Sequence, residues 1–290
     1  RSFEDRRTFY GLYAHDAWTP VRALTISGGG RWDATREKLH AVGQEVGFDA
    51  EVSDDSRKDS AWSGDLAALV RLLPESGAGP LGALNVYGNW KSSFKPAAPN
   101  LTEAEDAHIL DPVRTHSLEG GVKGEAFAGQ LSFEAAAFQL DFLNLVVGNL
   151  NQDGDPELLN AGHERFKGFE ASATFAPAAL PGLRLTGGWA HHDPRFVQFT
   201  YLNEEGQLRN VAGKQVELAP REMWNARASY TGPHGLGAWV AGRHQSERPL
   251  SRRNVAWTPG FVEVDAGLTF ATKPATISVT GRNLGDSRHY

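Results

Sequence analysis

Apolar residues recur at every second position along most of this chain, and this period of two limits its possible folds more than any other feature. In residues 24–33, Leu24, Ile26 and Trp32 alternate with polar or small residues, and residues 262–270 show the same pattern. Successive side chains of a strand point to opposite faces. The pattern therefore predicts strands with one apolar and one polar face.

About twelve segments of this kind occur along the chain, most of them roughly seven to thirteen residues long. Strands of soluble sheets are usually about five or six residues long, whereas a tilted strand that crosses a bilayer needs about nine to eleven. The other segments are 8–18, 61–73, 81–90, 117–124, 131–142, 166–175, 183–191, 224–230, 236–245 and 275–281. Their length favours strands that cross a membrane.

The connections between these segments alternate in length. Short turns rich in Pro and Gly are expected at 19–20, 75–80, 125–129, 176–182, 232–235 and 273–274. Long polar loops are expected at 34–60, 91–115, 144–164, 193–222 and 246–260. Outer-membrane barrels have tight turns on one rim and extended loops on the other. We therefore predict an all-β, antiparallel transmembrane β-barrel with up-and-down strands.

Composition and missing motifs exclude several kinds of function. With no Cys, the chain cannot form disulfides, thiolate nucleophiles or Cys-ligated metal sites. Its 29 Lys and Arg against 35 Asp and Glu give a net charge of -6, which argues against binding nucleic acid. No His-Glu-x-x-His, Gly-x-Ser-x-Gly or phosphate-binding loop occurs. We expect neither enzymatic activity nor a cofactor.

Two stretches could suggest a metal, and neither supports one firmly. His191, His192 and Asp193 are adjacent, so on a strand they point to opposite faces and cannot share an ion without a bend. Residues 149–157 resemble a calcium loop but lack the leading Asp and the bidentate Glu of an EF-hand. We interpret 149–157 as an extracellular loop, with calcium binding as the alternative, and assign no metal site.

Aromatic residues gather near the expected strand ends. On a barrel such residues form girdles at the two membrane surfaces, although aromatics also favour strands in general. The residues concerned are Tyr10, Tyr13, Trp18, Trp32, Trp62, Tyr87, Trp90, Trp189, Trp224 and Tyr230.

Six groups of residues, in this order, resemble motifs of one membrane-protein family. They are Tyr13–Trp18 with Gly30–Asp33, Tyr87 with Phe94–Pro96 and Pro99–Leu101, Ser117–Gly124, Asn160–Gly162 with Gly168–Glu170, Ala219–Arg221, and Asn283–Tyr290. Together they are similar to the barrel of TonB-dependent outer-membrane receptors. Trp32 replaces the usual Tyr, and Gly285 replaces the usual Phe.

The resemblance implies a larger architecture than twelve strands. Members of the family have a plug domain, a segment that contacts TonB, and a barrel of about 22 strands. We therefore expect residues 1–290 to be part of such a barrel, with the plug and the closing strands absent from it. An open sheet in lipid leaves unsatisfied backbone groups at both edges. A closed twelve-strand pore is the alternative.

The resemblance also implies a function in the bacterial outer membrane. We expect a receptor that takes up a ferric siderophore or a similar scarce nutrient by TonB-dependent transport. Its partners would be the nutrient, the TonB complex through the plug, outer-membrane lipid and lipopolysaccharide. The alternatives are a passive pore or structural β-barrel and, from another class, a soluble β-sandwich that binds a ligand, whose exposed apolar faces would promote aggregation.

Ligand capture would come from long-loop residues and from inward-facing residues near the outer rim. Ferric siderophores are usually anionic and often aromatic, so Arg side chains and flat aromatic rings suit them. The candidates are Arg195, Tyr201, Arg209, Arg243, Arg252, Arg253 and Trp257. Each could instead be a solvated loop side chain or, for the Arg residues, a contact to lipopolysaccharide phosphates.

Overall fold

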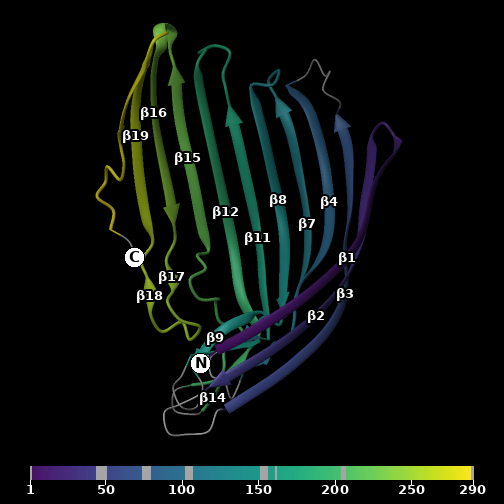
Figure 1. Cartoon of the computed structure of the whole chain (residues 1–290). Coiled ribbons are helices and arrows are strands. Elements are labelled where there is room, and N and C mark those ends of the chain that lie inside the picture. The colour runs from purple at the N-terminus through teal and green to yellow at the C-terminus, as the bar shows by residue number, and fades with distance from the viewer. Residues whose placement is uncertain are drawn as a thin grey trace.

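Twelve strands form one antiparallel sheet in which each strand pairs with its neighbours in the sequence of long strands (Figure 1). The computed structural model describes residues 2–43, 51–73, 80–101, 107–150, 156–160, 162–203 and 207–288. The strands are β1 (Ser2–Val21), β2 (Leu24–Gly43), β3 (Glu51–Leu73), β4 (Leu81–Lys95), β7 (Val113–Ala126), β8 (Leu131–Leu143), β11 (His163–Phe175), β12 (Leu183–Gln198), β15 (Glu222–Thr231), β16 (Leu236–Gln245), β19 (Phe261–Ala271) and β20 (Thr276–Gly281). The prediction of about twelve up-and-down strands is confirmed.

Helix is almost absent from the described part of the chain, where the single short 3₁₀ turn is η1 (Pro233–Gly235). Among the described residues, no helix has the length and apolarity needed to span a bilayer, a finding that does not bear on membrane-crossing strands.

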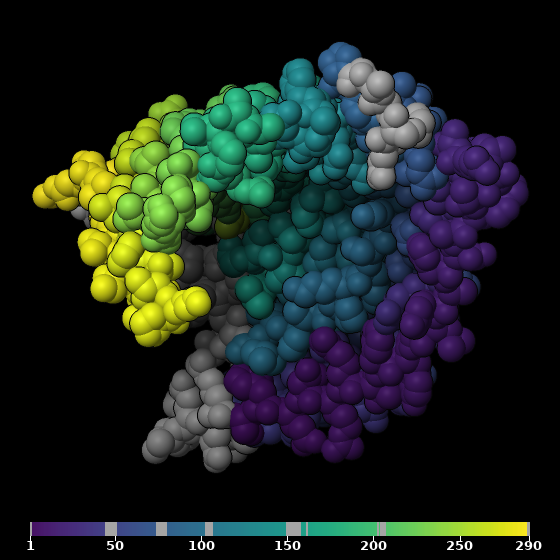
Figure 2. All heavy atoms as spheres, turned by 90° about the horizontal axis from the view of Figure 1, so that it is seen from above, coloured from purple at the N-terminus to yellow at the C-terminus, as the bar shows by residue number. Residues whose placement is uncertain are grey.

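The sheet curves around a hollow and does not close on itself. Viewed from above, the wall runs from the purple N-terminal strands through teal to the yellow C-terminal strands, with the hollow between them (Figure 2). Within the described residues, β1 pairs only with β2 and β20 pairs only with β19. The alternative of a closed twelve-strand pore is therefore wrong for this sheet.

The two faces of the sheet differ sharply in chemistry. On the outward face, Leu118, Phe169, Val240 and Leu268 are all exposed, and Leu268 keeps 65% of its surface accessible. In the described part of the chain, no second sheet packs over these apolar side chains. A β-sandwich needs two apolar faces packed together, so the soluble alternative is not supported.

The two rims carry connections of different kinds. The short turns that the structure describes lie at one rim, the top in Figure 1, which we call the turn rim. The other, which we call the loop rim, carries four two-stranded hairpins. They are β5 (Pro99–Asn100) with β6 (His108–Ile109), β9 (Val146–Leu150) with β10 (Pro156–Asn160), β13 (Thr200–Leu202) with β14 (Leu208–Asn210), and β17 (Arg248–Pro249) with β18 (Trp257–Thr258).

The first long loop is a correction to the sequence prediction. Residues 34–60 were expected to form a loop, but β2 continues to Gly43 and β3 begins at Glu51. Here outward side chains such as Arg36 and Lys38 are charged, while Glu37 and Leu39, which alternate with them on the inner face, are buried. The strand geometry persists although the apolar alternation ends, so apolar periodicity alone underestimates these strands.

The first turn also lies slightly beyond its predicted place. It was expected at Thr19 and Pro20, whereas β1 continues to Val21 and the chain turns at residues 22–23. The pairing of β1 with β2 is irregular between Trp18 and Val21. Pro20 has no N–H to donate to the ladder, and Pro within a sheet is confined to such irregular or edge positions.

We expect Val240→Arg to destabilise the sheet in a bilayer by about 2–4 kcal/mol, because it places a cation on the lipid-facing side near the middle of β16. The adjacent Ala241 faces inward, opposite Arg227 and Asp265, so Ala241→Arg is the matched control and is expected to be tolerated. The measurement is urea unfolding of the full-length protein in bilayers. Equal destabilisation by both variants would contradict the assignment of the two faces.

Candidate ligand-binding site

At the loop rim the long connections fold against the inner face of the sheet, and two groups of contacts hold them there. We call the first the β3 anchor, which consists of Arg7, Glu37, Asp55, Arg57, Asp59, Asp111 and their partners. We call the second the β12 anchor, which consists of Glu164, Phe196, Phe199, Tyr201, Val211, Val216, Glu217 and Arg252. Between them they determine the position of the exposed loop residues.

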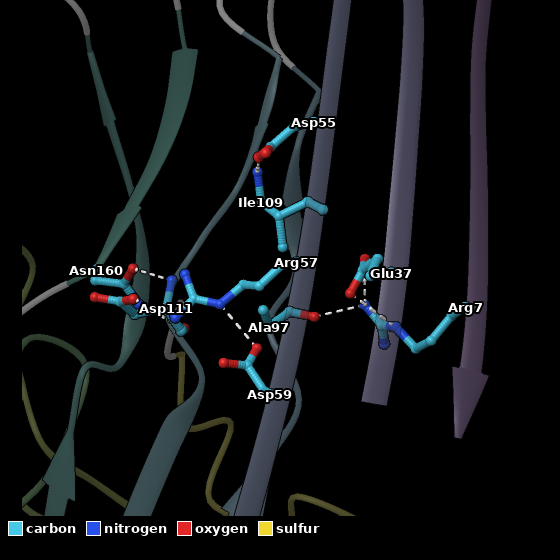
Figure 3. A network of polar contacts seen from close by, with 9 residues as sticks. All are labelled: Arg7, Glu37, Asp55, Arg57, Asp59, Ala97, Ile109, Asp111 and Asn160. Atoms are coloured by element: carbon cyan, nitrogen blue, oxygen red, sulfur yellow. Dashed lines mark hydrogen bonds and ion pairs between the residues drawn. The ribbon is translucent and has the colours of Figure 1, made fainter. Parts of the chain in front are cut away.

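The β3 anchor begins with an ion pair between the first two strands. The Arg7 guanidinium donates to both carboxylate oxygens of Glu37, at 3.0 and 2.6 Å, and also to the carbonyl of Ala97 (Figure 3). Glu37 is only 3% exposed. A bidentate Arg–carboxylate pair combines strength with defined geometry. This pair therefore ties the start of the connection from β4 to β7 to the wall.

A second Arg extends the anchor across the same connection. Arg57 donates through Nε to Asp59 at 2.8 Å and through Nη2 to Asp111 at 2.7 Å. Asp111 in turn exchanges hydrogen bonds with Asn160 (Figure 3). The side-chain amide of Asn160 also donates to the carbonyl of Asn144. The contacts thus join β3, the β5–β6 connection and the β9–β10 hairpin.

Apolar packing accompanies these polar contacts. Leu39 and Ala41 on the inner face of β2 form a buried cluster with Ala97, Ala107 and Ile109. The backbone N–H of Ile109 donates to Asp55 at 2.7 Å. The inner face of the strand extension is therefore covered by the β5–β6 connection, which explains why this polar segment remains an ordered sheet.

The β12 anchor is built on aromatic rings at the end of β12. Phe196 and Phe199 are at most 2% exposed, their ring centroids lie 5.5 Å apart, and they pack with Val211 and Val216. Tyr201 continues the row, at 5.8 Å from Phe199. This cluster fills the inner side of the loop rim beside β11 and β12.

Arg252 closes the β12 anchor from the connection between β16 and β19. Its guanidinium lies 5.2 Å from the Phe199 ring and 5.0 Å from the Tyr201 ring, within cation–π range. It also donates to the carbonyl of Gly148 at 2.7 Å and lies 3.5 Å from a carboxylate oxygen of Glu217. One side chain thus joins three connections of the loop rim.

Glu164 is a residue of the β12 anchor whose pKa departs from its ordinary value. It lies on the inner face at the loop-rim end of β11, beyond the apolar outward stretch that begins at Phe169, and is 3% exposed. Burial and, to a smaller extent, repulsion from Glu217 raise the pKa of Glu164 to about 7, while Arg252 acts in the opposite direction. Its carboxyl can therefore change charge near neutral pH.

Two of the sequence candidates belong to the β12 anchor. Arg252 and Tyr201 are half-buried and contact each other, so their side chains support the loops. A third candidate, Arg195, lies on the outward face at the end of β12 and bonds Asp193 and the carbonyl of Gly213. Because Arg195 points away from the hollow, we remove it from the site.

The other four candidates remain accessible. Arg209 in β14, Arg253 in the loop after Arg252, and Trp257 in β18 are exposed at the loop rim. Arg243 lies on the inner face of β16, where it donates to Glu263 at 2.8 Å and keeps 59% of its side chain exposed. These residues could contact an anionic, aromatic ligand that enters from the loop rim.

Sequence reasoning missed the residues of both anchors that do not resemble ligand contacts. Glu164 and Phe196 sit in segments expected to be loop, and the inward position of each follows only once the register of β11 against β12 is known. Glu37 and Arg57 lie within the loop expected at 34–60, and Arg7 lies just before the strand expected at 8–18.

Of the two stretches that could suggest a metal, the structure describes the histidine pair fully and the calcium-like run in part. His191 bonds Glu222 on the outward face, while His192 lies 3.3 Å from Glu170 on the inner face, as the strand argument predicts. Among the described residues, no group of three or more His, Cys, Asp or Glu is arranged to hold a metal ion. Residues 151–155 of the calcium-like run lie outside the described residues.

Comparison with known proteins gives one family. Residues 1–284 match the family model described as "TonB dependent receptor-like, beta-barrel". The chain is 26% identical to the metal-pseudopaline receptor of Pseudomonas aeruginosa over 268 residues, which cover 90% of this chain and 34% of that receptor. It is also 26% identical to the ferrioxamine B receptor of Salmonella typhimurium over 237 residues, covering 80% of this chain and 28% of that receptor.

Solved structures agree on the fold. The ferric yersiniabactin uptake receptor of Yersinia pestis matches with a TM-score of 0.81 at 18% identity, over 99% of this chain and 42% of that structure. Of the pseudopaline and ferrioxamine B receptors, in contrast, the chain spans about a third of the length.

The β12 anchor should weaken as pH rises from about 5 to 8. The pKa of Glu164 is about 7 in the folded protein against an ordinary value of 4.5, so the folded state holds this proton more tightly than the unfolded chain. Below pH 4.5 both states are protonated, and above pH 7 the buried charge costs up to about 3 kcal/mol. Amide hydrogen exchange of residues 211–216 in the wild-type protein is expected to accelerate accordingly.

Glu164→Gln should remove this pH dependence, and Glu170→Gln, an exposed carboxylate on the same face of β11, should preserve it. Each variant is compared with the wild-type protein at the same pH, which cancels the intrinsic pH dependence of exchange. An unchanged response in Glu164→Gln would assign the effect to another group.

Proposed function

Since this chain belongs to the TonB-dependent receptor-like β-barrel family, we propose that it forms part of the wall of a receptor that takes up a ferric siderophore or a similar scarce nutrient. The family consists of transport receptors of the bacterial outer membrane. Uptake would be driven by the TonB complex acting on a plug domain elsewhere in the protein. In this proposal, residues 1–290 contribute twelve strands to a barrel of about 22.

The observation that carries this proposal is the single-layered sheet with long connections folded over its inner face at one rim. Such a wall can hold an aqueous path or a plug on its polar side while its apolar side meets lipid. The pseudopaline and ferrioxamine B receptors take metal chelates, according to their names. They support a chelate as the class of ligand.

The accessible candidates give the ligand its contacts in this proposal. Arg209 and Arg253 would attract an anionic chelate at the mouth, and Trp257 would offer a flat surface, with its indole N–H bonded to the carbonyl of Asn254 at 3.2 Å. Arg243 lies deeper on the inner wall. The two anchors reduce the loss of loop entropy on binding because they hold the connections in place. The barrel itself would perform no catalysis.

Deleting the gene for the full-length receptor should abolish uptake of at least one radiolabelled metal chelate, and a strain that lacks TonB should show the same loss. A set of ferric and other metal siderophores is tested, with uptake measured in whole cells. Uptake that continues unchanged without TonB would favour the alternative of a passive pore or structural barrel.

The double variant Arg209→Ala/Arg253→Ala should weaken binding of that chelate by about tenfold or more, since charge-assisted contacts are each worth roughly 1.5–3 kcal/mol when buried and less when exposed. Arg195→Ala is the control, because it removes an Arg of the same rim that points away from the hollow. Binding is measured by fluorescence titration of the purified receptor. A loss confined to Arg195→Ala would contradict the proposed site.

A further inference from the structure

The β12 anchor contains a group of buried polar atoms that have no hydrogen-bond partner in the protein. Among the residues that the structure describes, four buried side-chain atoms lack such a partner, and all of them belong to the segments 215–217 and 251–252. Buried polar groups are nearly always hydrogen-bonded in folded proteins, so four exceptions at one place indicate a bound species. The atoms are Gln215 Oε1, Glu217 Oε2, Ser251 Oγ and Arg252 Nη1.

Hydrogen bonds and an ion pair hold the two segments side by side. The Asn254 side chain accepts from the backbone N–H of Gln215 at 2.8 Å. Its amide donates to the carbonyls of Gln215 and Ser251, at 2.8 and 3.2 Å. A carboxylate oxygen of Glu217 lies 3.5 Å from Nε of Arg252. The residues with unpartnered atoms therefore form one cross-linked unit at the loop rim.

One of the four atoms already has a weak acceptor. The guanidinium of Arg252 lies 5.2 and 5.0 Å from the ring centroids of Phe199 and Tyr201, and aromatic faces attract cations and accept N–H groups. The other three atoms are oxygens, from an amide, a carboxylate and a hydroxyl. The unit therefore lacks a cation or a donor, and it does not lack an acceptor.

The charges of the same unit favour a cation. Glu164 on β11 is 3% exposed, repels Glu217, and forms no hydrogen bond with any residue that the structure describes. When Glu164 is ionised, it and Glu217 share the single cation Arg252, which leaves one negative charge in excess. Buried charges in proteins are paired or coordinate metal ions. A bound cation would supply the missing partner.

We propose that Glu164, Gln215, Glu217 and Ser251 bind a calcium ion at the loop rim. Ca²⁺ takes about six to eight oxygen ligands in a flexible geometry, from carboxylates, amide carbonyls and water, whereas Mg²⁺ demands a stricter one. Softer metals prefer thiolate or imidazole ligands, and the four proposed ligands include neither.

The proposed site draws on neutral side chains as well as on charged ones. Half of its protein ligands are an amide and a hydroxyl, which agrees with the finding that no three His, Cys, Asp or Glu of the described residues form a metal group. The ion would join β11 to the connections that contain Gln215 and Ser251. It is not the transported nutrient, so the inference goes beyond the proposed function.

The test measures Ca²⁺ binding to the purified full-length receptor in detergent, after its metal ions have been removed with EDTA. Isothermal titration calorimetry is done at mildly alkaline pH, where Glu164 is ionised. Glu164→Gln should weaken binding about tenfold or more, because the number of charged ligands sets the affinity of a calcium site, and Ser251→Ala should weaken it less. The matched control is Glu170→Gln, an exposed carboxylate on the same face of β11, which should bind as the wild type does.

A second readout locates the ion. Saturating Ca²⁺ should slow amide hydrogen exchange of residues 211–216 and 251–254 in the wild-type receptor but not in Glu164→Gln, and Mg²⁺ at equal concentration should protect less. Thermal unfolding without Ca²⁺ should be unchanged or shifted upward in Glu164→Gln, since a buried charge is removed, so lost binding cannot be ascribed to misfolding.

Three outcomes would overturn the proposal. They are a wild-type receptor that binds no Ca²⁺, a Glu164→Gln variant that binds as tightly as the wild type, and an equal loss in Glu170→Gln. In the first case a buried water molecule would account for the unpartnered oxygens. None of these readouts depends on transport, so they stand apart from the uptake test.

Discussion

The need to satisfy every backbone hydrogen bond in a medium without water governs the rest of this structure. Strands in hydrocarbon must pair with neighbours along their whole length, and here each long strand pairs with the next in antiparallel register. Once the pairing is fixed, side chains can only alternate between the lipid side and the hollow. The apolar outward face, the polar inner face and the two unequal rims all follow from that single requirement.

The sequence allowed the strands inside the membrane to be predicted well because lipid imposes a strict chemical difference between their two faces. The range 236–245, for example, coincides with the observed β16, and 131–142 is one residue shorter than the observed β8. The same signal fails above the membrane. In the described parts of 34–60 the outward side chains are largely polar and Glu37 interrupts the apolar inner positions of Leu39 and Ala41. The alternation that reveals a strand in lipid therefore disappears, while the hydrogen-bonded ladder of β2 and β3 continues.

In the candidate site, too, the sequence identified some residues and could not identify others. A preference for Arg and aromatic residues in long loops identified accessible side chains such as Arg209 and Trp257, but residue type alone could not separate them from Arg195, which the register turns outward. Nor could it identify Arg252 as a support, because its contacts with Phe199 and Tyr201 bring together residues about 50 positions apart. Long-range contacts of this kind are set by the packing of connections that have no periodic pattern.

The position of Arg252 has a mechanical consequence for the mouth of the hollow. Its guanidinium holds the segment of Gly148, the aromatic rings after β12 and its own connection at once. The last two are also joined without it, because Gln215 and Asn254 exchange backbone-to-amide hydrogen bonds between them. Loss of that one cation would therefore loosen the segment of Gly148 first, while the other two connections stay linked.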